Sequence, residues 1–185
     1  FYTSCLAAAR GRTVTVRTFD FGADRTMADA YQGVQSSKLG LRGIRSSLRN
    51  LPQMAVQICA LMRAATKGPL RVMFPMVTDI EDWDSAMQVV DHCRRKLTER
   101  GVEFEPDVPF GVMLSVPAAC LTAEDFTAHG CRFFVIGTND LTQYTHAVSR
   151  ELAIAEHYYR PASPAMKKLI AMAVSYTHLT LPTSD

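Results

Sequence analysis

Arginine residues and small polar residues recur where apolar segments of this sequence end. The guanidinium group of arginine is a planar fork whose donors match phosphate and carboxylate oxygens. If these residues share one mouth, they predict a site for a small dianion or trianion. Taken singly, each arginine is more often a surface residue or a structural ion-pair partner. The residues concerned are Arg17, Asp20, Asp24, Arg42, Arg45, Ser115, Asn139, Asp140 and Arg150.

The apolar segments that precede these residues are short and rich in β-branched and aromatic side chains, which is typical of strands. Residues 133–136 are typical of a strand buried on both faces, and they stop abruptly at Gly137. Asn139 or Asp140 is then expected to cap a helix that starts near Leu141. An ordinary strand, turn and cap would explain this stretch equally well. The four predicted strands are 13–19, 70–75, 110–116 and 133–136.

Helical patterns separate the predicted strands. Asn50 and Pro52 suit the start of one helix, and Thr78-Asp-Ile-Glu81 is read as a capping box at the start of the next. Pro117 suits the first turn of a helix that is expected to run to His129. Further helices are expected over 1–10, from 141 and from 163 to 174, whereas 26–38 is expected to be a loop.

Alternating strands and helices predict an α/β protein with a parallel sheet. Neither a GxGxxG nor a GxxxxGK[ST] motif follows any predicted strand, so the sequence supports neither a dinucleotide fold nor a P-loop. Four strand and helix units in 185 residues favour a partial (β/α)8 TIM-type barrel, because a complete one needs about 250 residues. We expect this barrel to be truncated at both ends, and the polar strand ends to meet at one mouth.

Composition excludes some classes of partner. The chain is 48% apolar with a net charge of +2, and no run of Lys or Arg indicates nucleic acid or a membrane surface. With neither a membrane span nor a signal peptide in the sequence, a cytoplasmic location is the default expectation. The five cysteines show no CxxC or metal-type spacing, so we expect reduced thiols.

Five ordered motifs, from about Val14 to Ile170, resemble a known family. They resemble motifs of the phosphoenolpyruvate-binding barrel of enzyme I of the bacterial sugar phosphotransferase system, and related barrels occur in pyruvate phosphate dikinase and phosphoenolpyruvate synthase. In order, the motifs are RTFDFGADR (17–25), LGLRGIR (39–45), LRVMFPM (70–76), GVMLSVPAA (111–119) and GTNDLTQYT (137–145).

The resemblance implies a domain that binds phosphoenolpyruvate and Mg²⁺. The phosphoryl group would pass to a histidine on a separate domain and then to a histidine-containing phosphocarrier protein in sugar uptake, with the full-length protein forming a homodimer. By motif, Arg17, Arg42, Arg71 and Arg150 would hold the phosphate and carboxylate of the substrate. Asn139 would contact the phosphate, and Asp140 would ligate the metal. Arg71 fits least well on pattern, because it lies near the start of its strand.

The sequence departs from the family at three places. Ser115 occupies the position of a glutamate metal ligand, so we expect weakened Mg²⁺ binding. Ser149 replaces an aspartate that precedes Arg150. Residues 1–174 are taken as an incomplete barrel domain, whereas 175–185 resemble appended sequence, and no cysteine occupies the position of the family's acid cysteine. As this polypeptide, the chain is expected to be inactive alone.

Two alternatives remain open on the sequence. One is another enzyme of the same barrel superfamily, either a lyase or aldolase that handles pyruvate or a dikinase or synthase. The other is a non-catalytic binding or dimerisation module, which the missing glutamate would suit.

Overall fold

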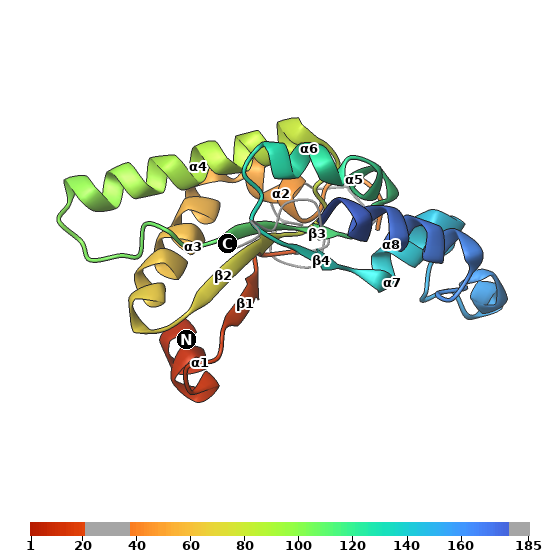
Figure 1. The fold of residues 1–185 in the computed structure, drawn as a ribbon, viewed down its shortest axis with the longest axis horizontal. Helices are drawn as coiled ribbons and strands as arrows, with labels where there is room; N and C mark the ends of the chain where they lie inside the picture. Colours follow the sequence, from red (N-terminus) through yellow and green to blue (C-terminus); the bar gives the residue numbers. More distant parts are fainter. Residues whose placement is uncertain (21–37, 178–185) are drawn as a thin grey trace, which may run out of the picture.

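Four parallel strands form the centre of the fold in a computed structural model that describes residues 1–20 and 38–177 (Figure 1). The sheet has the order β1-β2-β3-β4. Each strand pairs with the next along the chain, so every connection returns to the same end of the sheet. The strands are β1 (Val14–Arg17), β2 (Leu70–Phe74), β3 (Phe110–Leu114) and β4 (Phe134–Ile136).

Helices fill the connections between the strands, as the sequence predicted, and further helices precede β1 and follow β4. They are α1 (Tyr2–Ala9), α2 (Ile44–Arg49), α3 (Leu51–Ala64), α4 (Ile80–Glu99), α5 (Pro117–Leu121), α6 (Ala123–Ala128), α7 (Thr138–His146) and α8 (Pro164–Thr177). Two short 3-10 helices, η1 (Ala65–Lys67) and η2 (Ala153–Tyr158), complete the elements of the described residues. The parallel sheet and its helices confirm the expected α/β class and a partial barrel of the TIM type.

The two faces of the sheet differ because side chains alternate along a strand. Val72 and Phe74 of β2 are fully buried, and the ring of Phe74 packs against Trp83 of α4 with centroids 6.0 Å apart. The adjacent side chains Arg71 and Met73 are only half-buried and belong to the other face. A helix-covered face therefore supplies the core, and the opposite face is left to carry polar groups.

Several expected helix boundaries were wrong. Asp79, not Thr78, caps α4: its carboxylate accepts a hydrogen bond from the backbone N–H of Asp82 at 3.1 Å, while the Asp82 carboxylate accepts from Thr78. The cap is thus one residue later than expected, and the Asp82 side chain reaches back to Thr78 and not to the cap residue. The helix expected over 117–129 is interrupted at Thr122, which separates α5 from α6.

The predicted caps of two other helices had opposite outcomes. The side chain of Asn50 accepts from the N–H of Gln53, which confirms it as the cap of α3. The cap expected of Asn139 or Asp140 was wrong, because α7 already begins at Thr138 and both residues lie inside its first turn. Strand β4 is half-buried, not buried on both faces, because it forms an edge of the described sheet.

Two remaining expectations concern the loop over 26–38 and the boundary of the domain at residue 174. Helix α8 runs to Thr177, and residues 178–185 and the loop expected over 26–38 lie wholly or largely outside the described residues. The domain boundary at 174 therefore stays a prediction. Across the described ranges 1–20 and 38–177, no helix combines the length and apolar character needed to cross a bilayer.

Candidate functional site

Arg42 lies at the centre of a cluster of charged side chains at the carboxyl ends of the strands. Its Nε and Nη2 donate to the two carboxylate oxygens of Asp20, at 3.1 and 2.7 Å, in a bidentate pair. Nη2 also donates to Asp140 at 2.9 Å, and Nη1 donates to the hydroxyl of Tyr144 at 3.2 Å. Four of the five N–H donors of this guanidinium are therefore engaged within the protein.

The backbone around Arg42 explains its fixed position. Gly43 has φ 56 and ψ −133, a conformation open essentially to glycine alone. A Cβ at this residue would lie 2.8 Å from the carbonyl oxygen of Pro75 and 2.7 Å from the Cβ of Met76. The next N–H, that of Ile44, donates to Pro75 at 3.0 Å. Glycine thus lets the chain after Arg42 press against the segment that leaves β2.

Asp20 joins two arginines. Besides Arg42, its Oδ2 receives Nη1 of Arg17 at 3.3 Å, and the Asp20 side chain is only 2% exposed. The Arg17 side chain is 44% exposed. Arg17 therefore keeps part of its guanidinium open to solvent, whereas Arg42 is an internal anchor.

Burial and charge act against one another on Arg42. Burial alone would lower the pKa of its guanidinium, but the hydrogen bond and charge of Asp20 and the charge of Asp140 raise it above its ordinary value. Arg42 is therefore cationic at neutral pH. Two arginines and two aspartates make the cluster formally neutral.

The metal expected at Asp140 does not fit the residues that the structure describes. The Asp140 carboxylate is neutralised by Arg42, and Ser115 is a buried neutral hydroxyl whose nearest described partner is the sulfur of Met76 at 3.9 Å. Within residues 1–20 and 38–177, no group of three His, Cys, Asp or Glu side chains could hold a metal ion. Mg²⁺ prefers hard anionic oxygens, and this donor set supplies one already paired carboxylate.

The other predicted site residues are not joined to the cluster by any described contact. Arg71 donates to Thr15 at 2.7 Å, and its guanidinium lies 4.5 Å from the ring centroid of Phe133. Arg71 lies beside Thr15 in the register of β1 and β2. Thr15 precedes Arg17 by two residues, so both side chains project from the same face of the sheet.

The remaining predicted residues are separate from the cluster. Asn139 and Arg150 are exposed. Arg45 donates to the carbonyl of Gly40 and to Thr78, a structural role. Asp24 lies outside the described residues.

Three residues of the site region were missed from the sequence. Tyr144 accepts from Arg42 and donates to the carbonyl of Lys38, so it connects α7 to the segment before Arg42. Gln143, only 4% exposed, accepts from the N–H of Arg150, and its amide nitrogen has no partner among the described residues. Gln57 accepts from the N–H of Phe19 and holds the exit of β1. Tyr144 and Gln143 lie inside GTNDLTQYT, which was the available signal.

All five cysteines are free in the structure. Burial raises the pKa of Cys120 to about 11 and that of Cys131 to about 11. Burial, together with a hydrogen bond to Cys59, raises the pKa of Cys93 to about 12. These thiols are protonated at neutral pH and are weak nucleophiles.

Comparison with known proteins identifies the family of this chain. The sequence model of the family "PEP-utilising enzyme, PEP-binding domain" matches residues 1–180. The chain is 35% identical over 176 residues to a phosphoenolpyruvate-protein phosphotransferase of Cupriavidus necator, covering 94% of this chain and 30% of that protein. It is 35% identical over 180 residues to that of Enterococcus faecalis and 33% over 178 residues to that of Bacillus subtilis, covering 96% of this chain and 31% of each relative. The chain thus spans less than a third of the length of these relatives. It belongs to the family of phosphoenolpyruvate-binding domains of PEP-utilising enzymes.

Proposed function

We propose that this chain is the substrate-binding part of a phosphoenolpyruvate-protein phosphotransferase and that it binds phosphoenolpyruvate at the carboxyl ends of its strands. The observation that carries the proposal is the accessible guanidinium of Arg17, held by buried Asp20, whose carboxylate is fixed in turn by the bidentate pair with Arg42. A loose phosphoryl transition state needs positioned positive charge more than covalent help from the protein.

The neutral cluster suggests how charge would be supplied. Phosphoenolpyruvate is strongly anionic, and Arg42 and Arg17 are already balanced by two aspartates. Arg17 contributes the accessible donors, and Arg71 and Arg150 bring the additional positive charge needed to bind the phosphate and carboxylate. Asn139, exposed in the first turn of α7, contacts the phosphate. Arg42 mainly fixes Asp20 and Asp140, and thereby the positions of Arg17 and of the start of α7.

In the whole protein, we propose that the phosphoryl group passes from phosphoenolpyruvate to a histidine of another domain and then to a histidine-containing phosphocarrier protein, in sugar uptake in the cytoplasm. The P–O bond of the substrate breaks as a P–N bond forms on the acceptor histidine, and the enolate left behind is protonated to pyruvate. The whole protein is a homodimer. These steps need parts beyond this barrel segment, so the segment alone binds substrate without turnover.

Binding of phosphoenolpyruvate to the full 185-residue chain tests the proposal directly by calorimetry. We expect binding that weakens at least about tenfold in Arg17→Gln, because a charge-assisted hydrogen bond to the substrate is lost. The matched control is Arg95→Gln, an exposed arginine of α4 on the helical side of the fold. Absence of binding at millimolar substrate, or equal weakening in both variants, would overturn the proposal.

Magnesium binding is the part of the family's function that the donor set of the described residues does not support, and we propose that Ser115 is the cause. Ser115 lies at the carboxyl end of β3, where a carboxylate would join Asp140 as a second hard oxygen ligand. We expect Ser115→Glu to bind Mg²⁺ at least about tenfold more tightly than the chain as it stands, measured by calorimetry with phosphoenolpyruvate present and with circular dichroism as the check on folding. Equal affinities in a folded variant would contradict this role of Ser115, and would favour a site that binds substrate without metal.

A further inference from the structure

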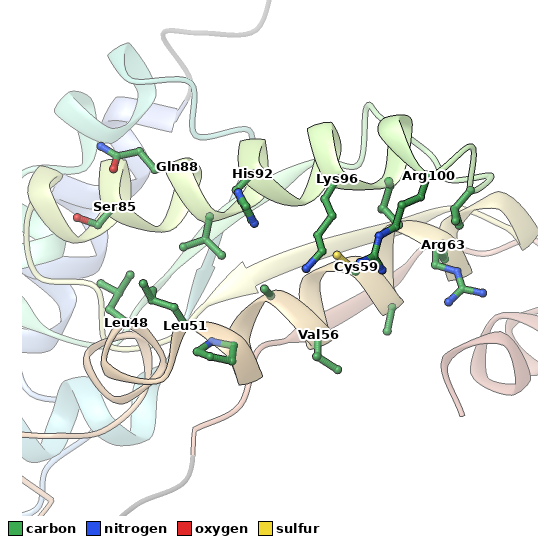
Figure 2. Close-up of a pocket in the computed structure, with 16 residues that line it drawn as sticks. Leu48, Leu51, Val56, Cys59, Arg63, Ser85, Gln88, His92, Lys96 and Arg100 are labelled. Atoms are coloured by element: carbon green, nitrogen blue, oxygen red, sulfur yellow. The ribbon is translucent and has the colours of Figure 1, made fainter.

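A long groove runs between the exposed sides of α3 and α4, which pack against each other below it (Figure 2). It lies on the helical side of the fold, whereas Arg17 and Arg71 belong to the sheet. Its volume is about 1090 Å³, at or beyond the upper end of ordinary small-molecule pockets. Residues from Ser85 in α4 to Arg100, which caps the end of that helix, line one side, and residues from Leu48 to Arg63 line the other. At about 1.5 Å per helical residue, the groove is about 20 Å long.

The groove changes in character along its length. At one end, where α3 and α4 begin, Leu48, Leu51 and Pro52 face Ser85 and Gln88. The other end, where both helices finish, carries Arg63, Lys96 and Arg100. Figure 2 shows Lys96 and Arg100 extending from α4 toward Cys59 on α3. One end is therefore apolar and neutral, and the other is cationic.

The floor on α3 consists of small side chains, Ala55, Cys59 and Ala60, which leave room for a third backbone to approach. Leu51, on the α3 side, is 49% exposed, which leaves an apolar contact unfilled. Every lining residue that carries a fixed charge is basic. Within residues 1–20 and 38–177, none of Arg63, Lys96 and Arg100 takes part in an ion pair.

We propose that this groove docks an amphipathic helix of about 14 residues from a partner protein whose polar flank is acidic. The length corresponds to about four helical turns, the apolar end suits leucine-type anchors at helical spacing, and the basic end requires carboxylates for electrostatic complementarity. Docking would form a third helix beside α3 and α4. This surface is separate from the substrate site, so the inference does not depend on phosphoenolpyruvate binding.

A designed peptide pair tests the inference on the full chain. The first probe is a fluorescein-labelled, 14-residue amphipathic peptide with leucines on one face and glutamates on the other, and the second carries lysines in place of the glutamates. Fluorescence anisotropy should show binding of the glutamate peptide only, weakening as salt screens the charges. The double variant Lys96→Glu/Arg100→Glu should raise the Kd at least about tenfold. Arg95→Glu, on the same helix but outside the groove lining, should change it less than about twofold.

A chemical footprint locates the bound peptide. Cys59 lies in the groove lining, whereas half-buried Cys5 of α1 does not, so the two thiols form an internal comparison. The glutamate peptide should slow alkylation of Cys59 by N-ethylmaleimide and leave that of Cys5 unchanged. Three results would overturn the inference: no binding, equal binding of both peptides, or no effect of the charge reversal. Protection of Cys59 by dodecanoate but not by the peptide would also overturn it, and would assign the groove to a small amphiphilic anion.

Discussion

Replacing Asp20 by asparagine should remove much of the electrostatic support of the site while changing almost no volume. Asp20 accepts from Arg42 at 3.1 and 2.7 Å and from Arg17 at 3.3 Å, with its side chain only 2% exposed. Asparagine keeps one acceptor oxygen but turns an N–H donor toward the guanidinium. Breaking a buried pair costs about 3–5 kcal/mol, and Asp140 still partly balances Arg42, so we expect a loss near 3 kcal/mol.

Urea unfolding at pH 7 measures this loss as a shift of the midpoint at constant m-value. The control is Asp91→Asn, which removes an exposed pair with Arg94 and should cost less than about 0.5 kcal/mol. Combining Asp20→Asn with Asp140→Asn should cost more than the sum of the two single changes, because Arg42 then loses both carboxylates. A loss below about 1 kcal/mol for Asp20→Asn, or strict additivity with Asp140→Asn, would refute the assignment of Arg42 as a charge-paired anchor.

Two further predictions concern the backbone beside the site and the buried thiols. Gly43→Ala should destabilise the fold by about 3 kcal/mol, since the new methyl group meets Pro75 and Met76 and the backbone is strained as well. The control is Gly40→Ala, which has φ 93 and open space around it and should cost only about 1 kcal/mol. Equal losses of the free energy of unfolding in urea would refute the steric argument. Burial raises the pKa of Cys120 to about 11, so its contribution to stability is complete below the unfolded value near pH 9 and is lost as pH rises to about 11. In urea titrations, the free energy of unfolding of the parent chain should therefore fall between pH 8 and pH 11 by about 2 kcal/mol more than that of Cys120→Ala. An equal fall in the two proteins would contradict the prediction.

The strands and their parallel order were readable because short β-branched runs alternate with helical patterns. Boundaries were less accurate where competing local hydrogen bonds decide the outcome. Thr78 and Asp79 are both good caps, and only the position of Asp82 selects Asp79. Thr122 carries no breaking signal such as proline or glycine, so the division between α5 and α6 was not predictable.

The sequence predicted which residues lie together in the candidate site. It did not predict which of them form ion pairs with one another. Arg17, Asp20, Arg42 and Asp140 were all expected at the same mouth, and the structure brings them into contact. Their mutual neutralisation was not expected, because the sequence does not say whether a carboxylate faces a metal or an arginine. Tyr144 was missed for a similar reason. A tyrosine on an amphipathic helix is expected to pack in the core, and the sequence does not show that its hydroxyl accepts a hydrogen bond from Arg42.

The order of the strands also has a kinetic consequence. Val112 pairs with Phe134, a short distance along the chain, whereas Val14 pairs with Leu70 across a much longer loop. Because the entropy of loop closure grows with separation, we expect β3 and β4 to associate early and β1 to join late. Arg17 ends β1 and Asp20 follows it, so the charged cluster would be among the last parts of the molecule to assemble. A chain stalled before that step would have a folded core but no site.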